Sequence, residues 1–306
     1  MGVQNVYSIK ELEVLSGIKA HTIRVWEKRY QLFEPERTET NIRYYTSLEL
    51  KKLLNISMLI EKGHKISKLS ALSPDTLHQT VSRTFIESPS ESDFYKSQIN
   101  QFVMSMLELD EALFDKSFSG CVLRYGLENT MIHVIYPFLN KVGMMWCVNN
   151  VSPSQEHFVS NLIRQKIHSA IDGLVLPAIS EPEKTYLLYL PENEDHEIGL
   201  LMSHYMLKKE GYKVIYLGAK VPFHDLEEIV KISHPAHIMT FFITPKSLTD
   251  AQEYLYLLEE NFPNMKFIIS GNHQLLNHLK ASSAVSKLYE ITDLIPFLSK
   301  NNQRSM

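Results

Sequence analysis

The last third of the chain alternates short apolar runs with amphipathic segments, and this alternation restricts the possible folds more than any other feature. The apolar runs are KTYLLYLP, YKVIYLG, HIMTFFIT, KFIISG and SKLYEI. The segments between them, such as IGLLMSHYMLKKEG, place apolar residues at the three-to-four spacing of a helix. Strands that alternate with helices predict a parallel sheet with crossover connections. Residues 181–300 are therefore predicted to form a doubly wound α/β domain.

One loop of this predicted domain has an unusual composition. The segment PENEDHEIG, residues 191–199, follows the first apolar run and surrounds His196 with acidic residues. Ligands of a doubly wound sheet bind outside the carboxyl ends of its strands, so His196 is expected at the functional edge. Glu194 can orient the imidazole, as the partners of metal-bound histidines commonly do. A charged loop whose histidine has no function is the alternative interpretation.

The N-terminal segment carries two short helical patterns joined by a glycine. Ser8 and Glu11 form a predicted capping box, Gly17 ends the first helix, and KAHTIRVWEKRY follows as the second. This arrangement predicts a helix-turn-helix, whose second helix enters the major groove of DNA. The turn-rich segment QLFEPERTETNIRYYT then predicts a β-hairpin wing. The side chains expected at DNA are Lys19, His21, Thr22, Arg24, Lys28, Arg29, Arg37, Arg43 and Tyr44.

The middle of the chain is predicted to be largely helical. Residues 76–92 are rich in serine and are predicted to be a linker after an N-terminal domain of residues 1–75. Residues 93–180 contain four segments with apolar residues at helical spacing, which predict a four-helix bundle. The run Ser152-Pro153-Ser154-Gln155 combines an N-cap, a first-turn proline and a capping-box partner. It places Glu156 and His157 near a helix start.

Composition narrows the class of protein. Hydrophobic residues make up 44% of the chain and charged residues 22%, which is ordinary for a globular protein. No apolar run approaches the roughly 18 residues of a membrane span, so no membrane association is expected. Cys121 and Cys147 cannot form a disulfide framework, which favours a reducing cytoplasm. The net charge is −4, yet residues 1–80 carry a basic excess, which favours a nucleic-acid-binding module there.

Three motifs resemble known families, and together the resemblance covers nearly the whole chain. TIRVWEKRY, PERTETNIRYYT and EKGHKI, in this order, resemble the MerR-type winged-helix DNA-binding domain, although Gln31 stands where many relatives have glycine. Trp146, followed after nine residues by Glu156-His157, resembles the W-x9-EH motif in the helical cap of CarH/LitR-type light-responsive repressors. The sequence from Glu194 to Gly199 resembles the D/E-x-H-x-x-G motif of cobalamin-binding domains.

The resemblance implies a cytoplasmic transcription regulator, not an enzyme, that binds double-stranded operator DNA as a dimer or tetramer. It implies adenosylcobalamin as cofactor, with cobalt bound by His196 and the helical cap over its upper face. Light would break the cobalt–carbon bond and take the assembly apart, which releases the DNA. Gly199 would let the backbone approach the corrin closely. The residues implied at the cofactor are Trp146, Cys147, Glu156, His157, Glu194, His196, Gly199, Thr240, Ser270 and Gly271.

Some positions depart from the family pattern. Family members carry S-x-L and G-G motifs along a tunnel for the nucleotide tail, where this chain has Thr240-Phe241-Phe242 and Ser270-Gly271. Cys147 stands where the best-matched relatives have a histidine that can ligate cobalt after photolysis. Two interpretations of Cys147 are open, a buried structural residue and a thiolate that binds the exposed cobalt.

Two other functions fit parts of the sequence. Some relatives repress without cobalamin under the control of a protein partner; Phe242 and Ser270 favour this alternative, whereas Glu194, His196 and Trp146 oppose it. A corrinoid carrier subunit of an enzyme has similar cap and base modules. The N-terminal DNA-binding module opposes an enzymatic role. The absence of a pattern for a substrate barrel opposes it as well.

Overall fold

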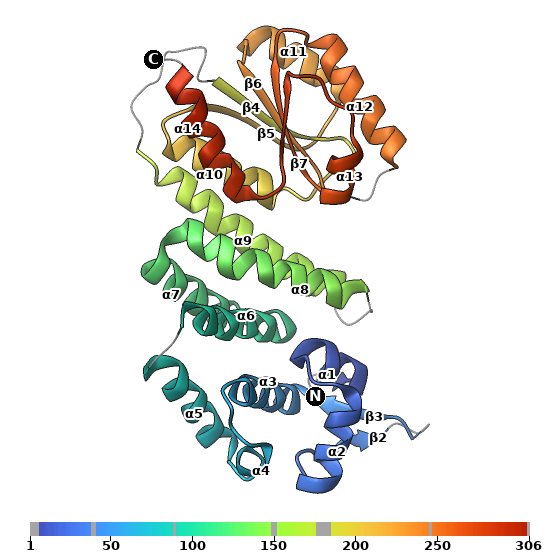
Figure 1. Cartoon of the computed structure of the whole chain (residues 1–306), viewed down its shortest axis with the longest axis vertical. Helices are drawn as coiled ribbons and strands as arrows, with labels where there is room; N and C mark the ends of the chain where they lie inside the picture. The colour runs from blue at the N-terminus through green and yellow to red at the C-terminus, as the bar shows by residue number, and fades with distance from the viewer. Residues whose placement is uncertain are drawn as a thin grey trace. The chain divides into compact units, whose positions relative to one another are not determined.

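The structure is a computed structural model of the chain that describes residues 6–37, 41–87, 90–147, 152–175, 185–244 and 247–304. The chain divides into two compact units, Met1–Val159 and Ser160–Met306, whose elements are drawn in Figure 1. No helix within the described ranges is both long and apolar enough to cross a membrane.

The first unit begins with the predicted helix-turn-helix and wing. Its elements are β1 (Val6–Tyr7), α1 (Ile9–Ser16), α2 (Ala20–Tyr30), β2 (Glu36–Arg37), β3 (Arg43–Thr46), α3 (Ser47–Glu61), α4 (Ile66–Leu69) and α5 (Pro74–Glu87). Ser8 and Glu11 form the capping box of α1, and Gly17 ends it with a φ of 74°. The three short strands pair antiparallel in the order β1-β3-β2. The predicted winged helix-turn-helix is therefore confirmed.

The predicted linker is mostly helical. Helix α5 covers most of residues 76–92, and Leu77 and Val81 on it are buried. These two residues are one helical turn apart and give α5 an apolar stripe, which the serine-rich composition of the segment concealed. The first unit contains both the N-terminal module and most of the helical segment, and the predicted domain boundaries stay predictions.

Salt bridges connect these two parts of the first unit. Lys62, which follows α3, pairs with Asp93 on the next long helix. Lys96 Nζ lies 2.6 Å from a carboxylate oxygen of Glu61. These two pairs hold the end of α3 against the helix that begins at Glu91.

The rest of the first unit consists of long helices, as predicted. They are α6 (Glu91–Glu108), α7 (Glu111–Thr130), a π-helical turn (Met131–Ile135), α8 (Tyr136–Cys147) and α9 (Pro153–Asp172). Gly126 kinks α7 with a φ of 77°. Buried apolar side chains such as Phe102, Phe114 and Phe138 fill the space between α6, α7 and α8. Helix α9 begins in the first unit and ends in the second.

The second unit is the predicted doubly wound α/β domain. Its strands are β4 (Thr185–Pro191), β5 (Lys213–Val221), β6 (His237–Phe242), β7 (Lys266–Gly271) and β8 (Val285–Leu288). Its helices are α10 (Ile198–Lys209), α11 (Phe223–Ser233), α12 (Leu248–Asn261), α13 (His273–His278), a 3₁₀ turn (Ile291–Asp293) and α14 (Leu294–Arg304). All strand pairs are parallel, in the order β5-β4-β6-β7-β8.

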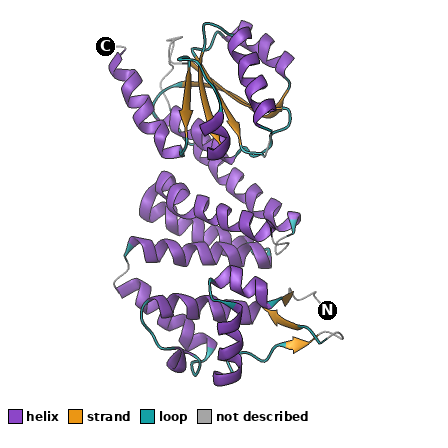
Figure 2. Ribbon diagram, turned by 45° about the vertical axis from the view of Figure 1, so that its right-hand side comes forward, coloured by secondary structure: helices purple, strands orange, loops and turns teal. Residues whose placement is uncertain are grey.

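Helices cover both faces of this sheet, with α11 and α12 on one side and α10 and α14 on the other (Figures 1 and 2). Leu187 and Tyr189 of β4 pack against Leu226 of α11 and Leu258 of α12. The chain crosses from β5 over β4 to β6, so the strand order reverses between β4 and β6. Ligands of open α/β sheets bind at such a switch point, outside the carboxyl ends of the strands.

Candidate functional site

The loops that follow β4 and β6 meet at this switch point. The loop after β4 carries Glu194 and His196, and the loop after β6 carries Ile243 and Thr244. The two segments are about fifty positions apart in the chain, and the parallel pairing of β4 with β6 brings them together. His196 therefore lies outside the carboxyl ends of the strands, as predicted.

Glu194 is the centre of the site. Its side chain is completely buried. One carboxylate oxygen accepts hydrogen bonds from the backbone N–H groups of Ile243 and Thr244, at 2.9 and 2.6 Å. The other accepts from the hydroxyl of Thr244 at 2.8 Å and from Nδ1 of His196 at 2.7 Å. Burial raises the pKa of Glu194, but the hydrogen bonds from His196 and Thr244 outweigh it and lower the pKa to about 2.

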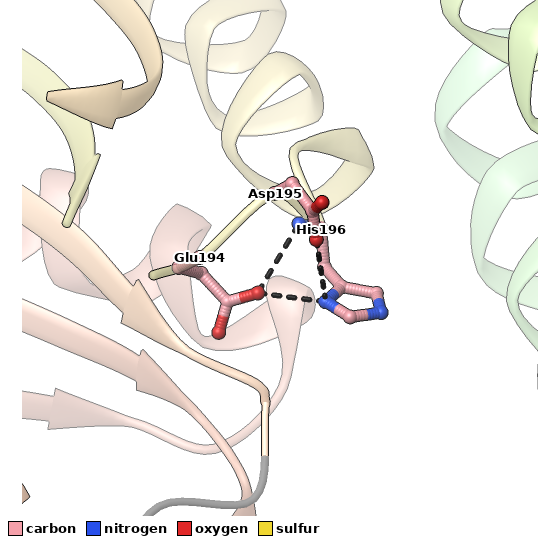
Figure 3. A group of neighbouring side chains, drawn as sticks. All are labelled: Glu194, Asp195 and His196. Carbon is pink, nitrogen blue, oxygen red and sulfur yellow. Dashed lines mark hydrogen bonds and ion pairs between the residues drawn. The ribbon is translucent and has the colours of Figure 1, made fainter. Parts of the chain in front are cut away.

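His196 lies at the surface, next to this buried carboxylate. Its side chain is 58% exposed, and its ring extends away from Glu194 (Figure 3). A carboxylate only accepts hydrogen bonds, so Nδ1 of His196 carries a hydrogen atom and donates a hydrogen bond to Glu194. Nε2, on the far side of the ring, is then the nitrogen with a lone pair for a metal. The buried carboxylate fixes the tautomer and raises the basicity of the imidazole.

Asp195 lies between these two residues and points into solvent. Its carboxylate is 3.0 Å from Nζ of Lys220, at the end of β5, and 3.7 Å from Nδ1 of His196. Ligand atoms of Glu194, Asp195 and His196 lie within 4.8 Å of one another. The oxygens of Glu194 are already occupied by donors, however, so Glu194 orients the histidine rather than binding a metal. The donor set fits a metal that takes one imidazole from the protein, as the cobalt of a corrin does.

Gly199 lies against the ring of Phe241. A Cβ atom at this position would lie 2.9 Å from Cε1 of Phe241. The glycine therefore lets the Phe241 ring of β6 pack against the first turn of α10. The approach of a corrin to Gly199 stays a prediction.

Two of the other predicted cofactor residues of the sheet, Thr240 and Ser270, are buried. Thr240 and Ser270 are 1% and 6% exposed. Phe242 is fully buried among side chains of α12, β7 and α13, including Leu255, Ile269 and Leu276. Gly271 has a φ of 132°, and a Cβ there would lie 2.2 Å from the carbonyl oxygen of Phe242. The contact of Thr240 and Ser270 with the cofactor stays a prediction.

The predicted residues of the helical segment lie near one helix end and one helix start. Trp146 and Cys147 belong to the last turn of α8, and their side chains lie outside the described residues. Both interpretations of Cys147 therefore stay predictions. Glu156 and His157 lie in the first turn of α9, where Ser152 and Gln155 form the predicted cap. His157 is 71% exposed, and its Nε2 is 3.6 Å from a carboxylate oxygen of Glu156.

The predicted DNA-contacting residues of the recognition helix α2 are mostly exposed. His21, Arg24, Lys28 and Arg29 lie on its solvent side, and Thr22 is half-buried beside His21. Lys19, at the start of α2, pairs with Glu13 of α1 at 3.1 Å. The exposed basic face of α2 can reach a phosphate backbone or base edges in a major groove.

The wing carries the remaining predicted DNA-contacting residues. Arg37 of β2 donates a 2.6 Å hydrogen bond to Oδ1 of Asn41, and the hydroxyl of Tyr44 donates to Glu36. Arg43 of β3 is 41% exposed on its side chain. Gln31, at the position of a glycine in many relatives, adopts a φ of 50° and ends α2 in the left-handed conformation that glycine favours.

Sequence reasoning missed a connection between α2 and the wing. Glu27 of α2 accepts a hydrogen bond from the hydroxyl of Tyr45 and lies 3.7 Å from Nε of Arg43. Burial and then the hydrogen bond to Glu27 raise the pKa of Tyr45 well above its usual value. Glu27 therefore sets the position of the wing relative to the recognition helix. Sequence reasoning also missed Thr244, because no local pattern links Thr244 to the loop that carries His196.

Comparisons with known proteins identify the domains of this chain. Residues 7–75 match the MerR HTH family regulatory proteins, and residues 98–169, which form the segment from α6 to α9, match the B12 binding domain. The chain carries a MerR helix-turn-helix domain and a B12-binding domain. The B12-binding match falls on the helices and not on the sheet that carries His196.

Two curated relatives match most of this chain, and a third matches a shorter segment. The HTH-type transcriptional repressor CarH of Myxococcus xanthus is 27% identical over 265 residues, which cover 85% of this chain and 86% of CarH. The repressor CarA of the same organism is 25% identical over 289 residues, 92% of this chain and 91% of CarA. The regulator MlrA of Salmonella typhimurium is 32% identical over 67 residues, 22% of this chain and 28% of MlrA. This chain is thus homologous to CarH and CarA.

Proposed function

We propose that this protein is a MerR-type transcriptional repressor, with a regulatory rather than an enzymatic role, whose binding to operator DNA is controlled by adenosylcobalamin and by light. Homology to the repressors CarH and CarA supports the repressor role. The observation that carries the cofactor assignment is the buried Glu194 that holds Nδ1 of the exposed His196 at the switch point of the sheet. A cytoplasmic location, where operator DNA is found, is part of the proposal.

His196 is the proposed cobalt ligand, through Nε2. Glu194 holds the imidazole in the tautomer that leaves Nε2 unprotonated, and Thr244 holds Glu194 with its hydroxyl and its backbone N–H. Adenosylcobalamin, when bound, supplies a cobalt–carbon bond that light can break. Trp146, Glu156 and His157 are proposed to contact the adenosyl group from the helical segment, and Thr240, Ser270 and Gly271 the rest of the cofactor.

DNA binding is assigned to α2 and the wing. Arg24 and Lys28 are proposed to read base edges in the major groove, and Arg43 to contact a phosphate. The regulator is proposed to bind its operator as a dimer or tetramer in the dark. Loss of the adenosyl group would then disrupt the assembly and release the DNA.

Replacement of the proposed ligand tests the cofactor assignment. We expect His196→Ala to abolish tight binding of adenosylcobalamin, or to leave bound cofactor without the absorption of an imidazole-coordinated cobalt. His224→Ala, which removes an exposed histidine of the same domain, should leave binding and spectrum unchanged. Wild-type binding and spectrum in the His196→Ala variant would refute the assignment.

A cobalamin-independent repressor controlled by a protein partner is the second candidate. Full burial of Phe242 against Leu255, Ile269 and Leu276 favours it, because the resemblance implies a tunnel for the nucleotide tail at this position. Absorption spectra of the purified protein mixed with adenosylcobalamin in the dark separate the two candidates. An unchanged cofactor spectrum, with operator binding retained, would support the second.

A further inference from the structure

Glu197, the residue after His196, is held by two elements that lie outside its own loop. One carboxylate oxygen accepts a 3.2 Å hydrogen bond from Nη1 of Arg164 on α9. The other accepts a 3.2 Å hydrogen bond from the hydroxyl of Tyr216 on β5. The side chain of Glu197 is 20% exposed and that of Arg164 30%, so both hydrogen bonds are partly shielded from water. Hydrogen bonds to a charged group are stronger than those between neutral groups.

The surroundings of this carboxylate restrict its orientation further. A second nitrogen of Arg164 donates to Oδ1 of Asn161, which fixes the plane of the guanidinium. The ring of Tyr216 stacks on His204 of α10, with centroids 5.1 Å apart and an interplanar angle of 16°. Burial, followed by the charge of Glu197, raises the pKa of Tyr216 above its usual value, so the hydroxyl stays a donor near neutral pH.

The loop after β4 that carries His196, called the histidine loop below, is thus held on both sides of His196. On one side, Thr244 of the β6 loop fixes Glu194, which holds the imidazole of His196. On the other side, Glu197 starts α10, where its carbonyl oxygen accepts from Leu201 at 2.8 Å, while its side chain is anchored to α9 and β5. With Glu194 and Glu197 held on the two sides, the backbone of His196 has fewer conformations available, and less entropy is lost when the imidazole binds a ligand.

We propose that Arg164 and Tyr216 are positioning residues that act through Glu197 to set the orientation of His196 toward cobalt. The inference rests on the proposed function, since it concerns the same ligand. Helix α9 also carries Glu156 and His157 in its first turn. Arg164 therefore links the histidine loop to the helix that bears the proposed contacts of the adenosyl group.

A role limited to holding α9 on the domain is the competing explanation, and the chain offers a matched control for it. Lys208 of α10 donates a 3.1 Å hydrogen bond to the carbonyl oxygen of Ile171, near the end of α9. This contact also joins α9 to α10, but it does not involve Glu197 or the histidine loop. Lys208→Met should therefore loosen the helix without changing how His196 is presented.

The test uses the full-length protein and adenosylcobalamin in the dark at one fixed pH. Arg164→Gln and Tyr216→Phe are each expected to weaken binding by about fivefold, less than the loss typical for a direct partner of a ligand. The bound cofactor should also show a larger fraction of the spectrum of the His196→Ala complex, in which the imidazole is missing. Arg164→Lys should restore part of the wild-type spectrum, and the double variant should lose less than the two single losses combined.

The outcomes separate this inference from the proposed function. Wild-type spectra and affinities in both variants would overturn the positioning role while the cobalamin assignment stands. An equal spectral change in Lys208→Met would also overturn it, because general loosening of α9 would then explain the effect. If the wild-type protein does not bind adenosylcobalamin, the proposed function fails and the inference falls with it.

Discussion

Glu194 is fully buried and has both carboxylate oxygens occupied by donors, whereas His196, which it holds, is 58% exposed. A buried carboxylate is tolerated only when hydrogen bonds replace its lost hydration. Those hydrogen bonds come from Ile243, Thr244 and His196. Burial alone would raise the pKa of Glu194, but the hydrogen bonds from His196 and Thr244 lower it to about 2. Substitution of a single residue that donates to this carboxylate should therefore change the orientation of His196.

Thr244→Val is expected to weaken binding of adenosylcobalamin by about tenfold, the lower end of the effect of losing an indirect partner of a metal ligand. Valine keeps the shape of threonine but removes the hydroxyl that donates to Glu194. The free energy of unfolding should fall by about 1 kcal/mol, since one buried acceptor loses a donor. Thr244→Ser, which keeps the hydroxyl, is the control. Calorimetric titration and chemical denaturation measure the two effects, and equal affinities for the two variants would contradict the prediction.

His237, at the start of β6, should make the second unit sensitive to acid. It is 6% exposed and stacks on Tyr186 at 4.4 Å, and neither ring nitrogen has a hydrogen-bond partner within the described part of the chain. Burial, with a smaller effect of the charge of Lys266, lowers the pKa of His237 from 6.5 to about 4. The unfolded chain binds the proton first, so stability is lost as the pH falls from 6.5 to 4, by up to about 3 kcal/mol.

His237→Phe should remove this contribution while keeping the stack on Tyr186. The difference in the free energy of unfolding between the variant and the wild type should grow in favour of the variant as the pH is lowered from 7.5 to 4.5. Urea denaturation at several pH values measures it, and the comparison cancels the contributions of all other titrating groups. A difference that does not change with pH would show that His237 titrates normally in the folded protein.

At the scale of elements, Glu27 joins α2 and the wing, which together are the proposed DNA-binding surface. Its carboxylate contacts Tyr45 and Arg43 of β3, so the wing is set relative to the helix that would enter the groove. Arg24 and Lys28 lie on the exposed side of α2. Residues that read base edges and residues that contact phosphates should respond differently to substitution.

Arg43→Ala is expected to weaken binding to specific and unrelated DNA alike and to reduce the slope of log affinity against log salt by about one. Arg24→Ala should instead change the preference among operator variants, because a contact to a base edge carries about 1–3 kcal/mol of discrimination. Fluorescence anisotropy at several salt concentrations measures both, with Arg83→Ala on α5 as control. If Arg43→Ala alters sequence preference and leaves the salt slope unchanged, the assignment to phosphate is wrong.

At the scale of the whole molecule, the proposed function joins a DNA-binding module and a cofactor site in one chain. The N-terminal module and helices α6 to α8 belong to one compact unit, with the salt bridges from Lys62 to Asp93 and from Lys96 to Glu61 between them. A shift of these helices would therefore be transmitted to the DNA-binding module. The proposed output is a change of oligomeric state.

Protein loaded with adenosylcobalamin is expected to form a larger assembly in the dark than after illumination and to bind operator DNA only in the dark. Size exclusion with light scattering measures the mass, and a gel shift measures the DNA binding. His196→Ala, mixed with the same cofactor, should show no difference between dark and light. If the protein binds the cofactor but light has no effect, the protein is a cobalamin sensor that does not respond to light. If it does not bind the cofactor, the cobalamin-independent repressor is favoured.

Local patterns in the sequence were sufficient to predict much of this architecture. The capping box of Ser8 and Glu11, the start of α9 at Pro153 and the alternation of strands and helices depend on residues within one or two turns of each other. The position of His196 at the edge of the sheet followed from the rule for parallel strands. The linker prediction missed α5, because the serines elsewhere in residues 76–92 concealed a stripe of only a few apolar residues.

The tertiary structure alone decided which distant side chains complete the site. Thr244 reaches Glu194 because β4 pairs with β6, and Arg164 and Tyr216 reach Glu197 because α9 and β5 lie beside α10. Gly199 is required by the ring of Phe241 for the same reason. The order of strands in a sheet depends on the packing of the whole domain, which leaves no periodic trace in the sequence. The sequence by itself therefore determined the elements and the histidine, and only the fold determined the partners that hold it.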